Sequence, residues 1–348
     1  MNYFVYIKDI LGLSTNAENF SWCYGCVAPK TTEAEFNQCM VKINLSVRKT
    51  ADVFDESLNL ENLDRYNHFY AKPQSQKVYY ERSYLLNAKH RYSIEVLGNE
   101  VNVIVDSNYY KYVRYRFMNV HSLGYILTDL VSGILLMNGY ATLHCSSISI
   151  GDKALVIFAP PSTGKTLTAL RLCEYSGAKY IAEDIAITDG EFIYAVPWTS
   201  TFRCYNHSKE SKTDRFMDTL RKKVPVFQLV PIKKRKSIHA YLNNDFLVDS
   251  AEISDAILLG KGKLEVMRSD KGFLENIMNL SKYELNYYRS PTMLVMNYFN
   301  PDFSLDQMYE AEKLILGKLV ANNPGYRVNA QNALDYSKLI IEQIIEKA

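Results

Sequence analysis

Hydrophobic and polar residues alternate in the first third of the chain. The stretches 92–96 and 101–105 place an apolar side chain at every second position, as strands with one buried face do. Aromatic and β-branched residues, which favour strands, are frequent here, and the proline and polar residues of 73–77 indicate a loop. We therefore expect residues 1–120 to form a β-rich region.

The pattern changes at residue 122. Residues 122–137 are mostly apolar, which predicts a buried helix that ends near Gly139. This run is shorter than the roughly 18–20 apolar residues that cross a bilayer, and it carries Asp129. The N-terminus has neither the basic segment nor the cleavage site of a secretory signal. These features predict a cytoplasmic protein with no membrane partner.

From about residue 140, short apolar runs predict strands that alternate with helices. The predicted strands are 143–150, 153–158, 179–182, 185–188, 191–195 and 256–259. The predicted helices are 166–175, which closes at Gly177, and 271–280, 305–319 and 332–347. Strands interleaved with helices predict an α/β catalytic domain over 121–348, preceded by the β-rich region over 1–120.

Composition narrows the classes of protein. The 348 residues are 47% hydrophobic and 22% charged, which suits one large or two ordinary folded domains and excludes global disorder. Forty basic against thirty-eight acidic residues leave a net charge of +2, too near neutral for a protein that binds nucleic acid. Six cysteines in a chain of this length do not indicate a disulfide framework. Cys23 and Cys26 form a lone C-x-x-C without the second pair of a zinc site, so we expect reduced thiols.

Residues 159–166 have the pattern of a phosphate-binding loop. They read Ala-Pro-Pro-Ser-Thr-Gly-Lys-Thr and fit G-x-x-x-x-G-K-[ST], with alanine at the first glycine, between an apolar strand and a helix. In such a loop, backbone N–H groups at the helix N-terminus bind phosphate, Lys165 reaches the β- and γ-phosphates, and Thr166 holds Mg²⁺. Pro160 and Pro161 have no N–H, so the later residues must form the cradle. The predicted nucleotide contacts are Ser162, Thr163, Gly164, Lys165, Thr166 and Leu167.

The first predicted hairpin brings a histidine to this loop. Gly151 suits the first position of a two-residue II′ turn at 151–152, and that turn pairs His144 with Ala159 at the edge of the loop. An imidazole there can support the γ-phosphate or a catalytic base. The alternative is a structural histidine of the strand.

The strand before the second hairpin brings two acids. A two-residue turn at 189–190 pairs Asp184 with Ala195, so the segment that ends in Arg203 leaves the sheet beside Glu183 and Asp184. In phosphoryl transfer one carboxylate can deprotonate the attacking hydroxyl and the other can hold the metal. Arg203 is a candidate phosphate or substrate contact, and a solvated strand end is the structural alternative for the acids.

The spacing separates two classes of phosphate loop. The acids follow Thr166 after only seventeen residues, which leaves no room for the strand and helix that precede the acidic pair in AAA+ motor ATPases. The order of histidine, hairpin, phosphate loop, helix and acidic pair instead resembles the catalytic domain of HPr kinase/phosphorylase, over residues 140–200. That domain has the phosphoenolpyruvate-carboxykinase-type fold. The resemblance implies that Glu183 is the general base, that Asp184 and Thr166 serve the metal, and that His144 assists.

The chain departs from that family in three ways. Glutamate replaces aspartate at 183, glycines are lost at Ala159 and Ser162, and the later Glu-Ile-Arg-Gly-Leu-Gly-type signature is absent. The chain is therefore more similar to divergent HPr kinase-like proteins, including those that phosphorylate a serine of a precursor peptide in lasso-peptide pathways. The resemblance implies a kinase that uses ATP and Mg²⁺ and acts on a hydroxyl of a peptide or protein. A nucleotide-binding regulatory module without transfer and a small-molecule kinase are the alternatives.

Two further segments have less specific patterns. Seven cations lie within 221–236, which predicts either a docking surface for an acidic peptide or a solvated face. The aromatic region over 1–120 is a candidate for peptide recognition or for forming a homo-oligomer.

Overall fold

The computed structural model describes residues 1–18, 20–25, 28–83, 89–113, 121–198, 244–269, 272–285 and 287–347. Three features of the sequence lie outside these ranges: Arg203, the basic stretch over 221–236, and two of the six cysteines, Cys26 and Cys204. The described cysteines, Cys23, Cys39, Cys145 and Cys173, are free thiols.

The N-terminal region forms a nine-stranded sheet, as the alternating pattern predicts. Its strands are β1 (Asn2–Ile7), β2 (Leu11–Thr15), β3 (Lys30–Thr31), β4 (Val41–Arg48), β5 (Asp64–Tyr66), β6 (Phe69–Ala71), β7 (Lys77–Ser83), β8 (Lys89–Leu97) and β9 (Glu100–Asp106). They lie in the order β3-β1-β2-β4-β9-β8-β7-β6-β5. Two short helices, α1 (Glu33–Gln38) and α2 (Ser107–Tyr112), accompany this sheet.

The rest of the chain is a mixed sheet with helices, so the molecule is of the α/β type. The strands are β10 (Ala141–Leu143), β11 (Ser146–Ile150), β12 (Lys153–Phe158), β13 (Lys179–Ala182), β14 (Ala186–Thr188), β15 (Phe192–Tyr194), β16 (Ser250–Lys261), β17 (Glu265–Arg268) and β18 (Gly325–Ala330). The main path runs β10-β14-β15-β16-β12-β11-β13, and β18 pairs with β16 and β17. β12, β16 and β18 are parallel, whereas β11 is antiparallel to both β12 and β13.

The helices of this region are α3 (Leu123–Met137), α4 (Lys165–Ser176), α6 (Phe273–Glu284), α7 (Pro291–Phe299), α8 (Leu305–Asn322) and α9 (Ala333–Ile340), which a π-helical turn continues over Ile341–Ile345. α3 confirms the predicted buried helix, and Gly139 follows it with a φ of 82°. Among the described residues, none of the helices combines the length and hydropathy needed to span a bilayer.

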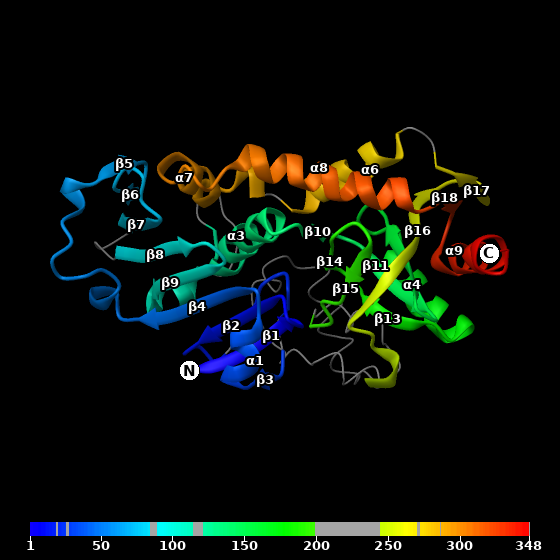
Figure 1. The fold of residues 1–348 in the computed structure, drawn as a ribbon, viewed down its shortest axis with the longest axis horizontal. Helices are drawn as coiled ribbons and strands as arrows, with labels where there is room; N and C mark the ends of the chain where they lie inside the picture. Colours follow the sequence, from blue (N-terminus) through cyan, green and yellow to red (C-terminus); the bar gives the residue numbers. More distant parts are fainter. Residues whose placement is uncertain are drawn as a thin grey trace, which may run out of the picture.

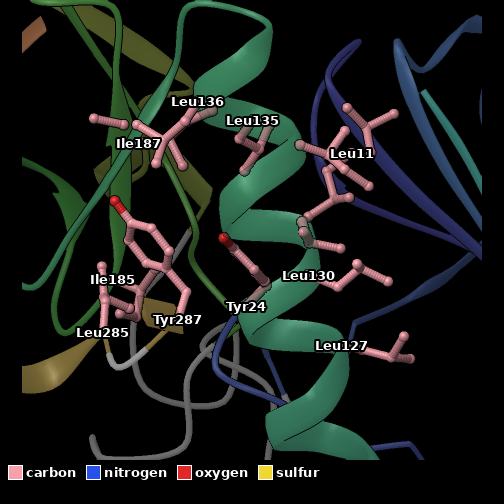
Figure 2. Close-up of a cluster of buried hydrophobic side chains, with 14 of the residues drawn as sticks. Leu11, Tyr24, Leu127, Leu130, Leu135, Leu136, Ile185, Ile187, Leu285 and Tyr287 are labelled. Atoms are coloured by element: carbon pink, nitrogen blue, oxygen red, sulfur yellow. The ribbon is translucent and has the colours of Figure 1, made fainter. Parts of the chain in front are cut away.

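The core is centred on α3, which lies between the two sheets (Figure 1). Figure 2 shows its leucines on two sides: Leu130 lies toward Leu11 of the first sheet, and Leu136 lies toward Ile187 of the second. A helix that is buried all round must be apolar on every face, which explains the nearly unbroken hydrophobic run in the sequence. α8 covers α3 and reaches both β10 and β16. The opposite face of the second sheet packs against α4 and α9.

The structure confirms the first hairpin but corrects its length. Ile150 pairs with Lys153 and Ser146 with Ile157, the register that a two-residue turn requires, and Gly151 has a φ of 59°. The ladder ends at Ser146, however, because β10 leaves it to pair with β14. The expected strand over 143–150 is therefore two strands, and His144 has no ladder partner at Ala159.

The predicted register of the second hairpin was wrong. Thr188 pairs with Ile193 instead of Glu191, which makes the connection four residues long. Two side chains hold this wider loop: Thr188 accepts the N–H of Gly190, and Asp189 accepts the N–H groups of Glu191 and Phe192. Asp184 consequently does not face Ala195, since the ladder ends at the pair between Ile187 and Tyr194.

Candidate functional site

One edge of the second sheet collects the predicted site residues. β12 ends at Phe158, and the phosphate-loop segment leads from it into α4. Because β13 runs in the same direction as β12, its end delivers Glu183 and Asp184 to the same edge. The antiparallel strand β11 begins there, just after His144. Strand direction alone therefore brings the loop, the acids and the imidazole together.

The loop has the backbone shape of a phosphate cradle. Ser162 and Gly164 have φ values of 62° and 109°, in the left-handed region, whereas Ala159 does not have a positive φ. The N–H of Thr163 donates to the carbonyl of Pro160 at 3.3 Å, which closes the turn. α4 starts at Lys165, and the first N–H groups of a helix have no partner within it. These amides and the positive end of the helix dipole suit an anion.

Lys165 and Thr166 are both buried at the start of α4, with 7% and 8% of their surface exposed. The hydroxyl of Thr166 donates a hydrogen bond to Oε1 of Glu183 at 3.1 Å. Glu183 is itself only 2% exposed. The hydroxyl of Ser146 donates a second hydrogen bond to this residue, to the backbone carbonyl of Glu183 at 2.6 Å. Sequence reasoning missed Ser146, which carried no signal beyond its place inside the strand predicted over 143–150.

Asp184 makes a different contact. Its Oδ1 lies 3.4 Å from Nδ1 of His144, and its side chain is 38% exposed, so this carboxylate reaches solvent. Burial, and to a lesser extent the nearby positive charge of Lys165, lower the pKa of His144 to about 4, and Asp184 opposes this shift. His144 is therefore neutral at pH 7. The expected imidazole reaches the site, but through the chain segment between β10 and β11 and not through pairing with Ala159.

The oxygen atoms at this edge suit Mg²⁺. Mg²⁺ prefers oxygen ligands and is usually held by one or two protein groups together with phosphates and water. Thr166 and Glu183 supply a hydroxyl and a carboxylate in contact. Within the described ranges, no group of three or more His, Cys, Asp or Glu residues forms a cage for a metal. The donor set thus fits a magnesium ion that arrives with a nucleotide better than one held by protein alone.

Three other residues predicted to contact the nucleotide or substrate are less informative. The Ser162 side chain is exposed at the loop surface, and Leu167 is half-buried one residue beyond Thr166. Arg203 lies outside the described residues, so its predicted phosphate contact stays a prediction.

Comparisons with known proteins find matches among solved structures alone. No protein-family model and no curated protein matches the chain. Among solved structures that match is the Hpr(Ser) kinase/phosphatase from Coxiella burnetii, with 8% sequence identity and a TM-score of 0.29. The match covers 59% of this chain and 97% of that one. A likeness at this level carries no argument about activity.

Proposed function

We propose that this chain is a kinase that transfers the γ-phosphate of ATP, bound with Mg²⁺, to a hydroxyl group. One observation carries the proposal: a strand–loop–helix phosphate cradle and two carboxylates meet at one sheet edge, and the Thr166 hydroxyl is hydrogen-bonded to Glu183. This combination supports a P-loop domain over 121–348 of the HPr kinase and phosphoenolpyruvate-carboxykinase type. The β-rich region over 1–120 would then recognise the substrate or form an oligomer.

The contacts support a division of labour between the two acids that differs from the one the resemblance implies. Because Thr166 directs its hydrogen to Glu183, the oxygen lone pairs of its hydroxyl are left for a cation. Glu183 therefore serves the metal side of the site. Asp184 is the carboxylate that an incoming hydroxyl can reach, since its side chain is partly exposed. Neutral His144 positions it through Oδ1, which leaves Oδ2 to accept a proton.

The reaction balances with these groups. The acceptor oxygen attacks the γ-phosphorus while its proton passes to Asp184, and the bond from that phosphorus to the bridging oxygen breaks to release ADP. Bound Mg²⁺ neutralises charge on the phosphates in this class of reaction. Lys165, at the start of α4, adds a fixed positive charge where the γ-phosphate would lie.

We infer that the acceptor is a Ser or Thr hydroxyl of a peptide or protein, and that a ribosomally made precursor peptide is the first to test. This choice follows from the resemblance of residues 140–200 to HPr kinase-like proteins. A regulatory module that binds nucleotide without transfer is the second candidate, because the loop departs from the family pattern at Ala159 and Ser162, where glycines are lost. A small-molecule kinase is the third.

The test uses the full chain with γ-labelled ATP and Mg²⁺. Acceptors are a mixture of synthetic peptides, each with one serine or threonine, and separately free serine, threonine and common sugars. We expect label on peptide, lost in Lys165→Ala. Label only on small molecules would favour the small-molecule kinase, and ATP binding with no transfer would favour the regulatory module. Absence of Mg²⁺-dependent ATP binding would overturn the proposal.

A further inference from the structure

A cavity borders the phosphate loop on the side away from the acids. It has a volume of about 500 Å³, within the range of small-molecule sites. Pro160 and Pro161 of the loop form one wall, so the cavity and the cradle share residues. The other lining residues come from β16, β18 and α6: Leu258, Leu259, Gly260, Asn276, Asn279, Leu280, Tyr283, Arg327 and Asn329.

The periodicities of strand and helix explain why these residues meet. Leu258 pairs with Arg327 and Gly260 with Asn329 across two parallel strands, and positions two apart on a strand share a face. That face is the one opposite α4 and α9, since Leu259 and Val328 pack into the cluster on their side. A Cβ on Gly260 would lie 2.5 Å from Oδ1 of Asn329, so glycine is needed for this amide to lie over the strand.

The helix supplies the opposite wall. The α6 residues at 276, 279, 280 and 283 follow the spacing i, i+3, i+4 and i+7, which is one face of a helix. This face presents two amides, a leucine and a tyrosine to the cavity. The same spacing is present in the sequence, but nothing there indicates that α6 lies over β16 and β18.

The position of the cavity relative to the acids indicates which substrate part it holds. In the sheet, β16 lies on one side of β12, and β11 and β13 lie on the other. The acids come from the β13 side, and the cavity lies on the β16 side. Phosphoryl transfer places the attacking and leaving oxygens roughly in line through the phosphorus. With the acceptor on the Asp184 side, the leaving diphosphate points toward the cavity.

The chemistry of the lining suits a nucleoside. Leu258, Leu280 and the two prolines offer an apolar surface for a flat ring. The side chains of Asn276, Asn279 and Arg327 make no hydrogen bond or ion pair with other residues that the structure describes. An asparagine amide carries both a donor and an acceptor, the pair that the edge of a purine presents. A guanidinium suits a ribose oxygen or the α-phosphate.

We propose that this cavity binds the purine base and ribose of the phosphate donor, with Asn276 and Asn279 against the base edge and Arg327 toward the sugar–phosphate. The inference rests on the proposed kinase function, since the phosphates would occupy the loop. The choice of phosphate donor would then be set by α6 and β18, elements that the phosphate-loop motif does not include.

Calorimetry with two anions separates the two proposals. We expect the parent chain with Mg²⁺ to bind ATP at least ~10-fold more tightly than inorganic tripolyphosphate, which has no nucleoside. The double variant Asn276→Leu, Asn279→Leu should lose this difference and bind tripolyphosphate as the parent does. Gln307→Leu, at an exposed amide of α8 outside the cavity, is the matched control and should bind both as the parent does.

The outcomes distinguish failure of the nucleoside assignment from failure of the kinase proposal. Equal binding of ATP and tripolyphosphate by the parent, or unchanged ATP binding by the double variant, would overturn the nucleoside assignment and leave the kinase standing. If neither anion binds, the kinase proposal fails. Saturation-transfer NMR with adenosine alone then tests whether the cavity binds a nucleoside. An adenosine signal that the double variant loses would then support the site, and no signal, or one that the variant keeps, would overturn it.

Discussion

Thr166 and Glu183 are joined by a hydrogen bond of 3.1 Å, although seventeen positions separate them in the sequence. The bond ties the first turn of α4 to the end of β13, and it determines the orientation of the Thr166 hydroxyl. Asp184, the next residue, contacts His144 instead. Two adjacent acids thus have different partners, and this difference allows their contributions to be measured separately.

Glu183→Gln should weaken Mg²⁺-dependent ATP binding by about 10-fold or more, because the amide keeps an acceptor for Thr166 but carries no negative charge for the cation. Asp184→Asn should bind MgATP as the parent does yet lose about 10²–10⁴-fold in transfer rate, the usual contribution of a general base. Calorimetry gives the affinity and single-turnover transfer gives the rate.

Thr166→Val is the control for the first half of this prediction, since it removes the hydroxyl and keeps the shape of the side chain. It should reproduce the weakened Mg²⁺ dependence of Glu183→Gln. The reverse pattern, in which Glu183→Gln keeps normal MgATP affinity and loses transfer, would return the base to Glu183 as the family resemblance implies.

Ser162→Gly should stabilise the folded chain by about 0.5–1 kcal/mol. Ser162 has a φ of 62°, and the left-handed conformation costs a residue with a Cβ roughly 1–2 kcal/mol, part of which is offset by the greater freedom of glycine when unfolded. Ser162→Ala keeps the strain and is the matched control. Urea unfolding measures both, and a glycine variant no more stable than the alanine variant would refute the strain.

Local sequence signals predicted much of this site because its elements are consecutive in the chain. The loop, α4, β13 and the first hairpin follow one another between residues 146 and 184, and each has its own turn or cap residue, such as Gly151 or Gly177. The register of the second hairpin could not be predicted from Asp189-Gly190 alone. Backbone N–H groups in that loop donate hydrogen bonds to the side chains of Thr188 and Asp189, and these bonds stabilise a wider loop.

Long-range packing accounts for what the sequence did not reveal. The cavity beside the loop needs α6 and β18, which lie more than a hundred residues beyond it and carry no motif. Burial likewise separates Glu183 from Asp184, which are neighbours in sequence and both carry a carboxylate. His144 was expected at the site through strand pairing, yet it arrives in the connection between two strands.

The pKa of His144 predicts an acid-dependent loss of stability in the Mg²⁺-free protein. Burial, and then Lys165, lower this pKa to about 4 against the attraction of Asp184. The unfolded chain, with a pKa near 6.5, takes up the proton first, so the free energy of unfolding falls as pH drops from about 6.5 to 4. The full effect is about 3 kcal/mol, because the two pKa values differ by about 2.5 units and each unit corresponds to 1.36 kcal/mol.

His144→Gln removes this titration and keeps a hydrogen-bonding side chain. Its free energy of unfolding should therefore change less with pH than that of the parent across this interval, and the two curves should run parallel above pH 7. Denaturant unfolding at a series of pH values measures both curves. Parallel curves throughout would show that His144 titrates normally in the folded protein.

Glu312 is a buried carboxylate on α8 that we expect to stabilise the fold. Glu312 is 2% exposed and accepts hydrogen bonds from Ser281 at 2.6 Å and from the hydroxyls of Tyr287 and Tyr288 at 2.8 Å each. These bonds link α8 to α6, the helix that walls the proposed nucleoside cavity, and α8 also lies over α3 and the second sheet (Figure 1). Burial, together with the nearby carboxylate, raises the pKa of both tyrosines, which therefore stay protonated and able to donate.

Glu312→Ala should destabilise the chain by about 3–5 kcal/mol, because it leaves a cavity and removes the acceptor of two buried hydroxyls and of the half-buried Tyr288 hydroxyl. Glu312→Gln keeps an acceptor oxygen and should cost less. The control is Glu310→Ala, whose exposed side chain pairs with exposed Lys313, and its effect should stay within about 0.5 kcal/mol. Because α6 depends on Glu312, Glu312→Ala should also weaken ATP binding while tripolyphosphate binding stays unchanged. Equal loss of both would mean that the network supports the whole domain and not the nucleoside wall in particular.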